Sequence, residues 1–126
     1  MPRALIIDDE SGIRFALRRW FERQGWFVLE ASDGDVGLQH MLAATDDSDE
    51  RLDVIICDMN LPKRSGESLY AEIERERPAL TTRIIFSTGD DVGSARPGSL
   101  LQTHPWVLQK PFDMGTLKGI VAAVAG

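Results

Sequence analysis

Ala4-Leu5-Ile6-Ile7-Asp8-Asp9 is the stretch that decides the fold, because it joins a short apolar run to two carboxylates. Val54-Ile55-Ile56-Cys57 repeats the pattern and ends at Asp58, and Lys110-Pro111 follows the last apolar run. Short runs of this kind that alternate with helical stretches predict a parallel sheet. The carboxyl ends of such a sheet open on one edge, where ligands bind, so these distant residues are expected to meet there.

The expected meeting of Asp8, Asp9 and Asp58 has an electrostatic consequence. Three carboxylates a few ångströms apart repel one another, and they stay ionised only with a cation between them. Mg²⁺ prefers hard oxygen ligands and is usually held by one or two carboxylates together with phosphate oxygens. Lys110 would add a mobile positive charge for the same phosphate. The strand ends therefore predict a site for Mg²⁺ and a phosphoryl group.

The composition indicates one ordinary globular domain over residues 1–126. Of the 126 residues, 43% are hydrophobic and 27% are charged, which is enough for a proper core. A net charge of -6 argues against nucleic acid or an anionic membrane as a direct partner. The single cysteine, Cys57, is interpreted as a small core residue. No apolar stretch reaches the roughly 18 residues of a membrane span, and we expect a cytoplasmic protein.

Five strand and helix units are expected along the chain. The predicted strands are 3–8, 26–31, 53–58, 83–88 and 106–109, and the predicted helices are 11–24, a helix capped by Asp33, a helix ending at Pro78, and 114–125. A solvated acidic loop is predicted at Thr45–Glu50. The remaining helix, within 90–103, contains two glycines and a proline that each cost roughly 1 to 3 kcal/mol. We therefore expect it to be short, late or irregular.

This order of five βα units, with Asp8-Asp9, Asp58, Thr88 and Lys110-Pro111 at strand ends, resembles the receiver domain of two-component response regulators. Asp58 lies 30 positions before Thr88 and 52 before Lys110, and both spacings are typical of that family. The resemblance covers the whole chain. It implies an α/β fold of the flavodoxin-like, doubly wound kind, with five parallel strands in the order 2-1-3-4-5 and five helices.

The resemblance also implies roles for the carboxylates. Asp58 would be the phosphoacceptor, whose carboxylate attacks a phosphoryl group and becomes an acyl phosphate. Asp9 would bind Mg²⁺ directly, and Asp8 would act mainly through water. The backbone carbonyl of Asn60 would be a further ligand of the metal.

Thr88 and Lys110 would each bind a phosphoryl oxygen, and this pull would alter the face made by the fourth helix and the fifth strand. Many family members carry an aromatic residue three positions before the lysine, where this chain has Val107. Trp106 is one position earlier, and a one-residue offset in a strand points a side chain to the other face. The usual aromatic switch is therefore not expected. The sequence from Trp106 to Phe112 is similar to receivers attached to hybrid sensor kinases.

The implied function is that of a signalling switch, which takes phosphate from a histidine kinase or phosphotransfer protein and changes a partner-binding surface. Such a protein catalyses only its own phosphorylation and dephosphorylation. No effector segment follows Gly126, so we expect the output through another protein or through a segment outside this chain.

Three alternatives remain open. A phosphohydrolase with an aspartyl-phosphate intermediate needs a second acid two residues after the nucleophile, where this chain has Asn60. A flavodoxin-like cofactor binder needs a phosphate loop rich in Gly, Ser and Thr after the first strand, which is absent. An inert receiver-like scaffold would leave the complete acidic set unexplained.

Several other side chains carry weaker expectations. His40 and His104 lack companions at metal-binding spacing and are interpreted as surface histidines. Phe15 is expected to point outward from the first helix, as a candidate anchor for a kinase helix pair. Asn60 and Asp90 would flank the line along which water attacks the acyl phosphate, which predicts a phosphorylated lifetime of minutes or less. The competing interpretation of Asp90 is a helix cap.

Overall fold

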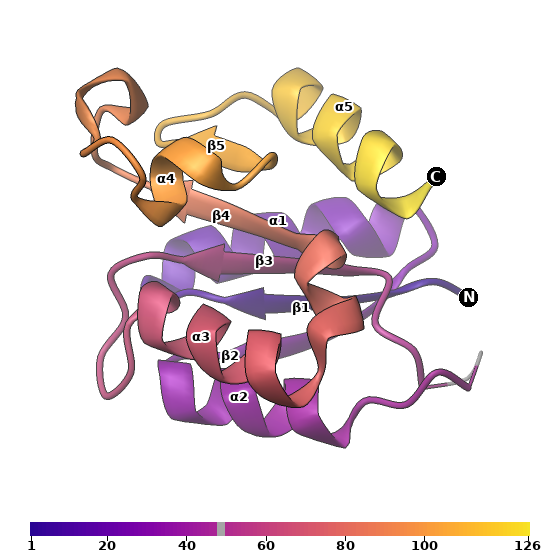
Figure 1. Ribbon diagram of the computed structural model, residues 1–126. Helices are drawn as coiled ribbons and strands as arrows, with labels where there is room; N and C mark the ends of the chain where they lie inside the picture. The colour runs from indigo at the N-terminus through magenta and orange to yellow at the C-terminus, as the bar shows by residue number, and fades with distance from the viewer. Residues whose placement is uncertain (48–49) are drawn as a thin grey trace.

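One parallel sheet forms the centre of the molecule, and the computed structural model describes residues 1–47 and 50–126 of it. Its strands are β1 (Arg3–Ile7), β2 (Phe27–Ala31), β3 (Val54–Asp58), β4 (Ile84–Thr88) and β5 (Val107–Gln109). They lie in the order β2-β1-β3-β4-β5, and every neighbouring pair is parallel. The predicted doubly wound fold is confirmed. Because all pairs are parallel, the five carboxyl ends lie at one edge, and the arrowheads of β1, β3 and β4 in Figure 1 point toward it.

Helices cover both faces of this sheet (Figure 1). They are α1 (Ser11–Arg23), α2 (Gly34–Ala43), α3 (Gly66–Glu76), α4 (Leu100–Thr103) and α5 (Met114–Ala125), with short 3₁₀ turns η1 (Pro78–Arg83) and η2 (Val92–Ser94). Buried residues of α1 and α5 form one core cluster with the sheet, and those of α2 and α3 form another. Among the described residues, no helix combines the length and apolarity that crossing a bilayer requires.

The strands are nearly continuous apolar runs because both of their faces are covered. In β1, Leu5 and Ile7 belong to the cluster under α2 and α3, whereas Ala4 and Ile6 belong to the cluster under α1 and α5. This alternation is the two-residue period of a strand. Cys57 is fully buried in β3, as predicted, and burial raises the pKa of its thiol.

Local signals mark the helix boundaries near the predicted positions. The Asp33 side chain accepts a hydrogen bond from the Val36 N–H at 2.8 Å and caps α2, as predicted. Gly25, at φ 85°, follows the end of α1 in the left-handed conformation that glycine adopts without strain. The acidic loop predicted at Thr45–Glu50 includes residues 48–49, which lie outside the described part of the chain.

The segment between β4 and β5 is irregular, as predicted. It contains the three-residue turn η2, a stretch with Gly98 at φ 79°, and the four-residue helix α4. Pro97 and Gly98 separate the two helical pieces, because neither residue favours a helix interior. The connection between β4 and β5 therefore contains only short helical pieces, whereas each of the other connections contains a longer helix.

The expectation that His104 lies on the surface is wrong. His104 follows α4, is only 8% exposed, and its Nε2 lies 2.6 Å from the carbonyl oxygen of Ile84. Its ring packs edge-on against Tyr70 and Phe86, at centroid distances of 5.6 and 4.9 Å. The aromatic partners come from distant parts of the chain, so no local pattern announced this burial.

Candidate functional site

Four acidic side chains gather at the carboxyl edge of the sheet. Asp8 and Asp9 follow β1, and Asp58 closes β3, so the neighbouring strands bring them together. Each of these residues and Glu10 offers a carboxylate oxygen, and these oxygens lie within 4.8 Å of one another. The three predicted carboxylates therefore meet. Glu10 was not predicted, although its position directly after the Asp8-Asp9 pair was the signal available for it.

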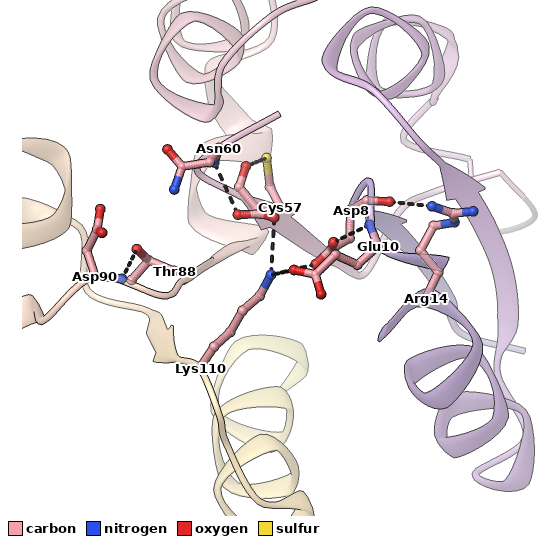
Figure 2. A network of polar contacts seen from close by, with 9 residues as sticks. Asp8, Glu10, Arg14, Cys57, Asn60, Thr88, Asp90 and Lys110 are labelled. Atoms are coloured by element: carbon pink, nitrogen blue, oxygen red, sulfur yellow. Dashed lines mark hydrogen bonds and ion pairs between the residues drawn. The ribbon is translucent and has the colours of Figure 1, made fainter. Parts of the chain in front are cut away.

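Lys110 is the cation that the structure places in this acidic cluster (Figure 2). Its Nζ lies 3.1 Å from Asp8 Oδ2, 3.1 Å from Asp58 Oδ2 and 3.5 Å from Glu10 Oε1. The Lys110 side chain is 15% exposed and follows β5, where a cis peptide bond joins it to Pro111. The ammonium group thus offsets the repulsion that the converging carboxylates create.

Burial differs among the carboxylates and divides the cluster. Asp8 and Asp58 are almost wholly buried, whereas Asp9 and Glu10 are exposed. Backbone N–H groups satisfy the buried pair: Glu10 donates to Asp8 Oδ1 at 2.9 Å, and Asn60 donates to Asp58 Oδ1 at 3.1 Å. Each buried carboxylate is therefore oriented by one backbone donor and by Lys110.

The cluster shifts the protonation of two of its members. Burial raises the pKa of Asp8, and hydrogen bonds from the Glu10 N–H and from Lys110 offset this only in part. Burial by itself would lower the pKa of Lys110, but its hydrogen bonds and charge contacts with Asp8 and Asp58 outweigh that effect, so the pKa is raised. Lys110 is therefore firmly charged, while the charge on Asp8 is costly and favours a further cation.

These donors fit a Mg²⁺ ion. Carboxylate oxygens are the hard ligands that Mg²⁺ prefers, and the ion is usually held by one or two of them with water in the remaining positions. Two buried and two exposed carboxylates each place an oxygen within 4.8 Å of the others. The structure thus supplies the donor chemistry for which the sequence predicted a metal at Asp8, Asp9 and Asp58.

Thr88 lies at the end of β4, beside the acidic cluster, and is fully buried. Its Oγ1 accepts a hydrogen bond from the Asp90 N–H at 3.0 Å, and its carbonyl accepts one from the Lys110 N–H at 2.7 Å. Figure 2 shows Thr88 and Asp90 on one side of Lys110, with Asn60 nearby. The backbones of Lys110 and Thr88 are therefore joined directly by a hydrogen bond.

Asp91, and not Asp90, caps the turn that follows β4. The Asp91 side chain accepts a hydrogen bond from the Gly93 N–H at 3.0 Å. The cap interpretation of Asp90 is therefore wrong, and the Asp90 side chain is exposed next to the site. Asn60 is also exposed, at the start of the connection from β3 to α3.

Arg14 supports the cluster from α1, and sequence reasoning missed it. Its Nη1 donates to the carbonyl oxygen of Asp8 at 2.6 Å, and its Nε lies 3.6 Å from Glu30 Oε1 on β2. The available signal was a basic residue in the first turn of a helix, where the macrodipole favours acidic ones. A residue that breaks this preference commonly has a specific partner, and here the partner is the backbone of a cluster residue.

The surface next to the cluster is apolar. A groove of about 450 Å³ runs between α1 and the turn after β5, and its lining includes Ile13, Leu17 and Phe112. Phe15 is 60% exposed on α1, as predicted. Its ring lies under the Arg19 guanidinium, at 5.6 Å from the ring centroid.

Val107, the first residue of β5, and Trp106, directly before it, pack on opposite faces of the sheet. Val107 packs with the cluster under α2 and α3, and Trp106 packs with the cluster under α1 and α5. This agrees with the one-residue offset in the sequence. The aromatic rings on the Val107 side of the sheet are those of Tyr70, Phe86 and His104.

Known proteins are similar to this chain in sequence and in fold. The transcriptional regulatory protein DltR of Streptococcus agalactiae is 33% identical over 116 residues, which cover 91% of this chain and 48% of DltR. The chain thus spans about half the length of that relative. A response regulator receiver domain protein from Clostridium thermocellum superposes with a TM-score of 0.79 at 27% identity, covering 99% of this chain and 94% of that one.

A further structure shares the fold at lower identity. It is the receiver domain of the sensor histidine kinase PA1611 from Pseudomonas aeruginosa, described with a magnesium ion in its active site cleft. Its TM-score is 0.83 at 22% identity, and the match covers 99% of this chain and 98% of that one. The family model described as the response regulator receiver domain matches residues 4–122. The chain therefore belongs to the response regulator receiver domain family.

Proposed function

We propose that this protein is a signalling switch that accepts a phosphoryl group on Asp58. One observation carries the proposal: Asp58 is buried at the end of β3, yet its carboxylate lies among three other acidic side chains and against Lys110. A structural role does not require so concentrated a set of charges. A site that receives a phosphate together with a divalent cation does.

The proposed chemistry is an in-line displacement at phosphorus. A carboxylate oxygen of Asp58 forms a bond to phosphorus while the bond from phosphorus to the donor's leaving atom breaks, and that electron pair departs with the leaving group. With a phosphohistidine donor, the leaving imidazole then takes up a proton. The Asn60 N–H on Oδ1 holds the carboxylate in one orientation during the transfer.

Asp8, Asp9, Asp58 and the carbonyl of Asn60 would hold Mg²⁺. The ion would neutralise the charge that builds on the phosphoryl oxygens. The backbone N–H of Glu10 keeps Asp8 turned into the cluster, and Arg14 holds the Asp8 carbonyl from the other side. These contacts let the protein present its acidic ligands with little rearrangement.

Lys110 and Thr88 would form the response to phosphorylation. A phosphoryl oxygen on Asp58 competes with the carboxylates for the Lys110 ammonium, and Thr88 can donate its hydroxyl proton to another oxygen. Because the Lys110 N–H donates to the Thr88 carbonyl, a shift of one residue would be coupled to the other. Their strands, β4 and β5, flank the irregular segment that contains α4. The output surface therefore includes this segment, with Val107 in place of a switching aromatic residue.

The partners follow from the same proposal. A histidine kinase or phosphotransfer protein would supply the phosphoryl group, and a downstream protein would recognise the altered face. DltR is named a transcriptional regulatory protein, but this chain matches less than half of it. The absence of direct contact with nucleic acid or membrane stays a prediction for residues 1–126, based on the net charge of -6. A cytoplasmic location likewise stays a prediction.

The test is intact-mass measurement after incubation with acetyl phosphate and Mg²⁺. Wild type should gain one phosphoryl group, and Asp58→Asn should gain none. Asp46→Asn, an exposed acidic residue outside the cluster, is the matched control and should be labelled like wild type. Equal labelling of wild type and Asp58→Asn contradicts the assignment. Continuous release of phosphate from small phosphate esters would instead support the phosphohydrolase alternative.

A further inference from the structure

The connection between β3 and α3 crosses the start of α2 at very close range. The Gly34 N–H donates to the Pro62 carbonyl at 3.2 Å. A Cβ atom at Gly34 would lie 2.7 Å from the Arg64 Cβ and 2.8 Å from its carbonyl carbon, and closer still to its carbonyl oxygen. Real Cβ atoms do not approach backbone in this way, so only glycine permits the contact.

Two ion pairs flank this contact and fasten the same two segments together. Lys63 Nζ lies 3.6 Å from Asp33 Oδ2, and Arg64 Nε lies 3.2 Å from Asp35 Oδ1. Lys63 has φ 68°, the left-handed conformation that is unfavourable for a residue other than glycine. Such a conformation persists where surrounding contacts hold it. We call the set Asp33, Gly34, Asp35, Lys63 and Arg64 the α2 clasp.

The clasped connection begins at the phosphoryl site. Asn60 donates its N–H to Asp58, and the Gly66 N–H closes the base of the connection by donating to the Met59 carbonyl at 3.0 Å. The tip, from Pro62 to Arg64, lies on α2. Because the base is closed and the tip is fastened, the position of the Asn60 backbone depends on where α2 begins.

We infer that the α2 clasp is a positioning element for the metal site: by holding the tip of this connection, it sets where the Asn60 carbonyl is presented. The inference rests on the proposed function, in which that carbonyl is a ligand of Mg²⁺. The clasp residues act through Asn60. Residues that orient metal ligands commonly change metal affinity by about tenfold or more when they are replaced.

Gly34→Ala tests the close contact, because the added methyl group must push the tip away from α2. Gly119→Ala is the matched control, since a Cβ at Gly119 in α5 meets nothing within 4 Å. We expect Gly34→Ala to raise the dissociation constant for Mg²⁺, measured by titration calorimetry, by about tenfold. The rate of acetyl phosphate labelling at saturating Mg²⁺ should stay within about twofold of wild type, and Gly119→Ala should match wild type.

The double variant Lys63→Ala/Arg64→Ala tests the ion pairs without adding volume. Lys63 is exposed and Arg64 is half-buried, so neither belongs to the core and the protein should fold even if Gly34→Ala does not. Simple electrostatics predicts that removing two positive charges from the protein tightens the binding of a cation such as Mg²⁺. The clasp predicts the opposite, about threefold weaker binding, because the connection loses two contacts with α2 and each such exposed ion pair contributes modestly.

The outcomes separate the clasp from the proposed function. Weaker Mg²⁺ binding in both variants, with labelling retained at saturating Mg²⁺, supports the clasp. A lower urea midpoint with an unchanged Mg²⁺ dissociation constant would show a purely structural role and overturn it. Unchanged or tighter binding in the double variant also overturns it. If wild type itself neither binds Mg²⁺ nor takes up phosphate, the proposed function fails instead.

Discussion

Replacing Lys110 with methionine removes the cation from the acidic cluster while keeping most of the apolar stem. The ammonium lies 3.1 Å from a carboxylate oxygen of Asp8 and 3.1 Å from one of Asp58. Both carboxylates are buried, so neither can turn to bulk water when Lys110 is lost. In the metal-free protein, Lys110→Met should therefore lower the free energy of unfolding substantially.

The magnitude follows from these distances. At an effective dielectric constant of about 20, each contact at 3.1 Å is worth about 5 kcal/mol of gross Coulomb attraction. Two carboxylate oxygens at the 4.8 Å limit of the cluster repel by about 3 kcal/mol on the same scale. Desolvation of the ammonium offsets much of the attraction. Removal of one partner from a buried ion pair costs about 3 to 5 kcal/mol. Because Lys110 is 15% exposed and partly solvated, we expect a loss of about 3 kcal/mol, at the lower end of this range.

The loss should depend on pH and on Mg²⁺. Burial raises the pKa of Asp8, and contacts with Lys110 oppose that rise, so the pKa climbs further in Lys110→Met. A folded protein whose acid has a raised pKa binds more protons than the unfolded chain, so lower pH stabilises it. The deficit should shrink as the pH falls through the titration of Asp8. Mg²⁺ should also reduce it, by supplying the missing positive charge.

Urea unfolding in chelator and in Mg²⁺, at about pH 7 and about pH 5, measures these effects. Lys118→Met, an exposed lysine on α5, is the matched control and should change the unfolding free energy by less than about 0.5 kcal/mol. A Lys110→Met protein as stable as wild type in chelator would refute the reasoning. So would a deficit that is equal at both pH values and with or without Mg²⁺.

Three further predictions concern the docking surface, the lifetime of the acyl phosphate and the buried histidine. Phe15→Ala should slow phosphotransfer from the cognate kinase, because this ring is 60% exposed on α1 and is available to a docking partner, while acetyl phosphate labelling stays unchanged. An equal loss in both assays would indicate misfolding. Replacing Asn60 and Asp90 with leucine should lengthen a phosphorylated lifetime of minutes or less by several-fold, because the larger side chains block the attacking water. A wild-type half-life of hours would contradict this. Burial lowers the pKa of His104, so the unfolded chain binds a proton that the folded protein refuses, and stability should fall as the pH drops below the ordinary value of 6.5. His104→Leu should flatten that slope in urea unfolding, and an unchanged slope would show that other groups cause it.

Much of the fold could be predicted because its signals are local. Each strand is a short apolar run, and the irregular segment between β4 and β5 was visible in Pro97 and Gly98. The residues at strand ends were also predictable, since parallel strands must all place their carboxyl ends at one edge. For that reason Asp8, Asp58 and Lys110 could be expected to meet before any distance between them was known.

The sequence could not announce contacts that depend on packing between distant elements. His104 has no polar or apolar pattern around it that indicates burial, because its partners Tyr70 and Phe86 come from α3 and β4. Glu10 gains its contact with Lys110, and Arg14 its contact with Glu30 on β2, only when elements far apart in the sequence pack together.

The sequence by itself thus determined the elements, their order along the chain and the chemical groups at the edge of the sheet, because apolar periodicity and strand-end residues act over a few positions. Only the tertiary structure decided which carboxylates are buried, that the Lys110 ammonium contacts both Asp8 and Asp58, and how closely Gly34 approaches Arg64. Those quantities are differences of a few ångströms between elements far apart in sequence. They arise from how two helical layers pack on one sheet. Local sequence propensity does not determine the distances between such elements.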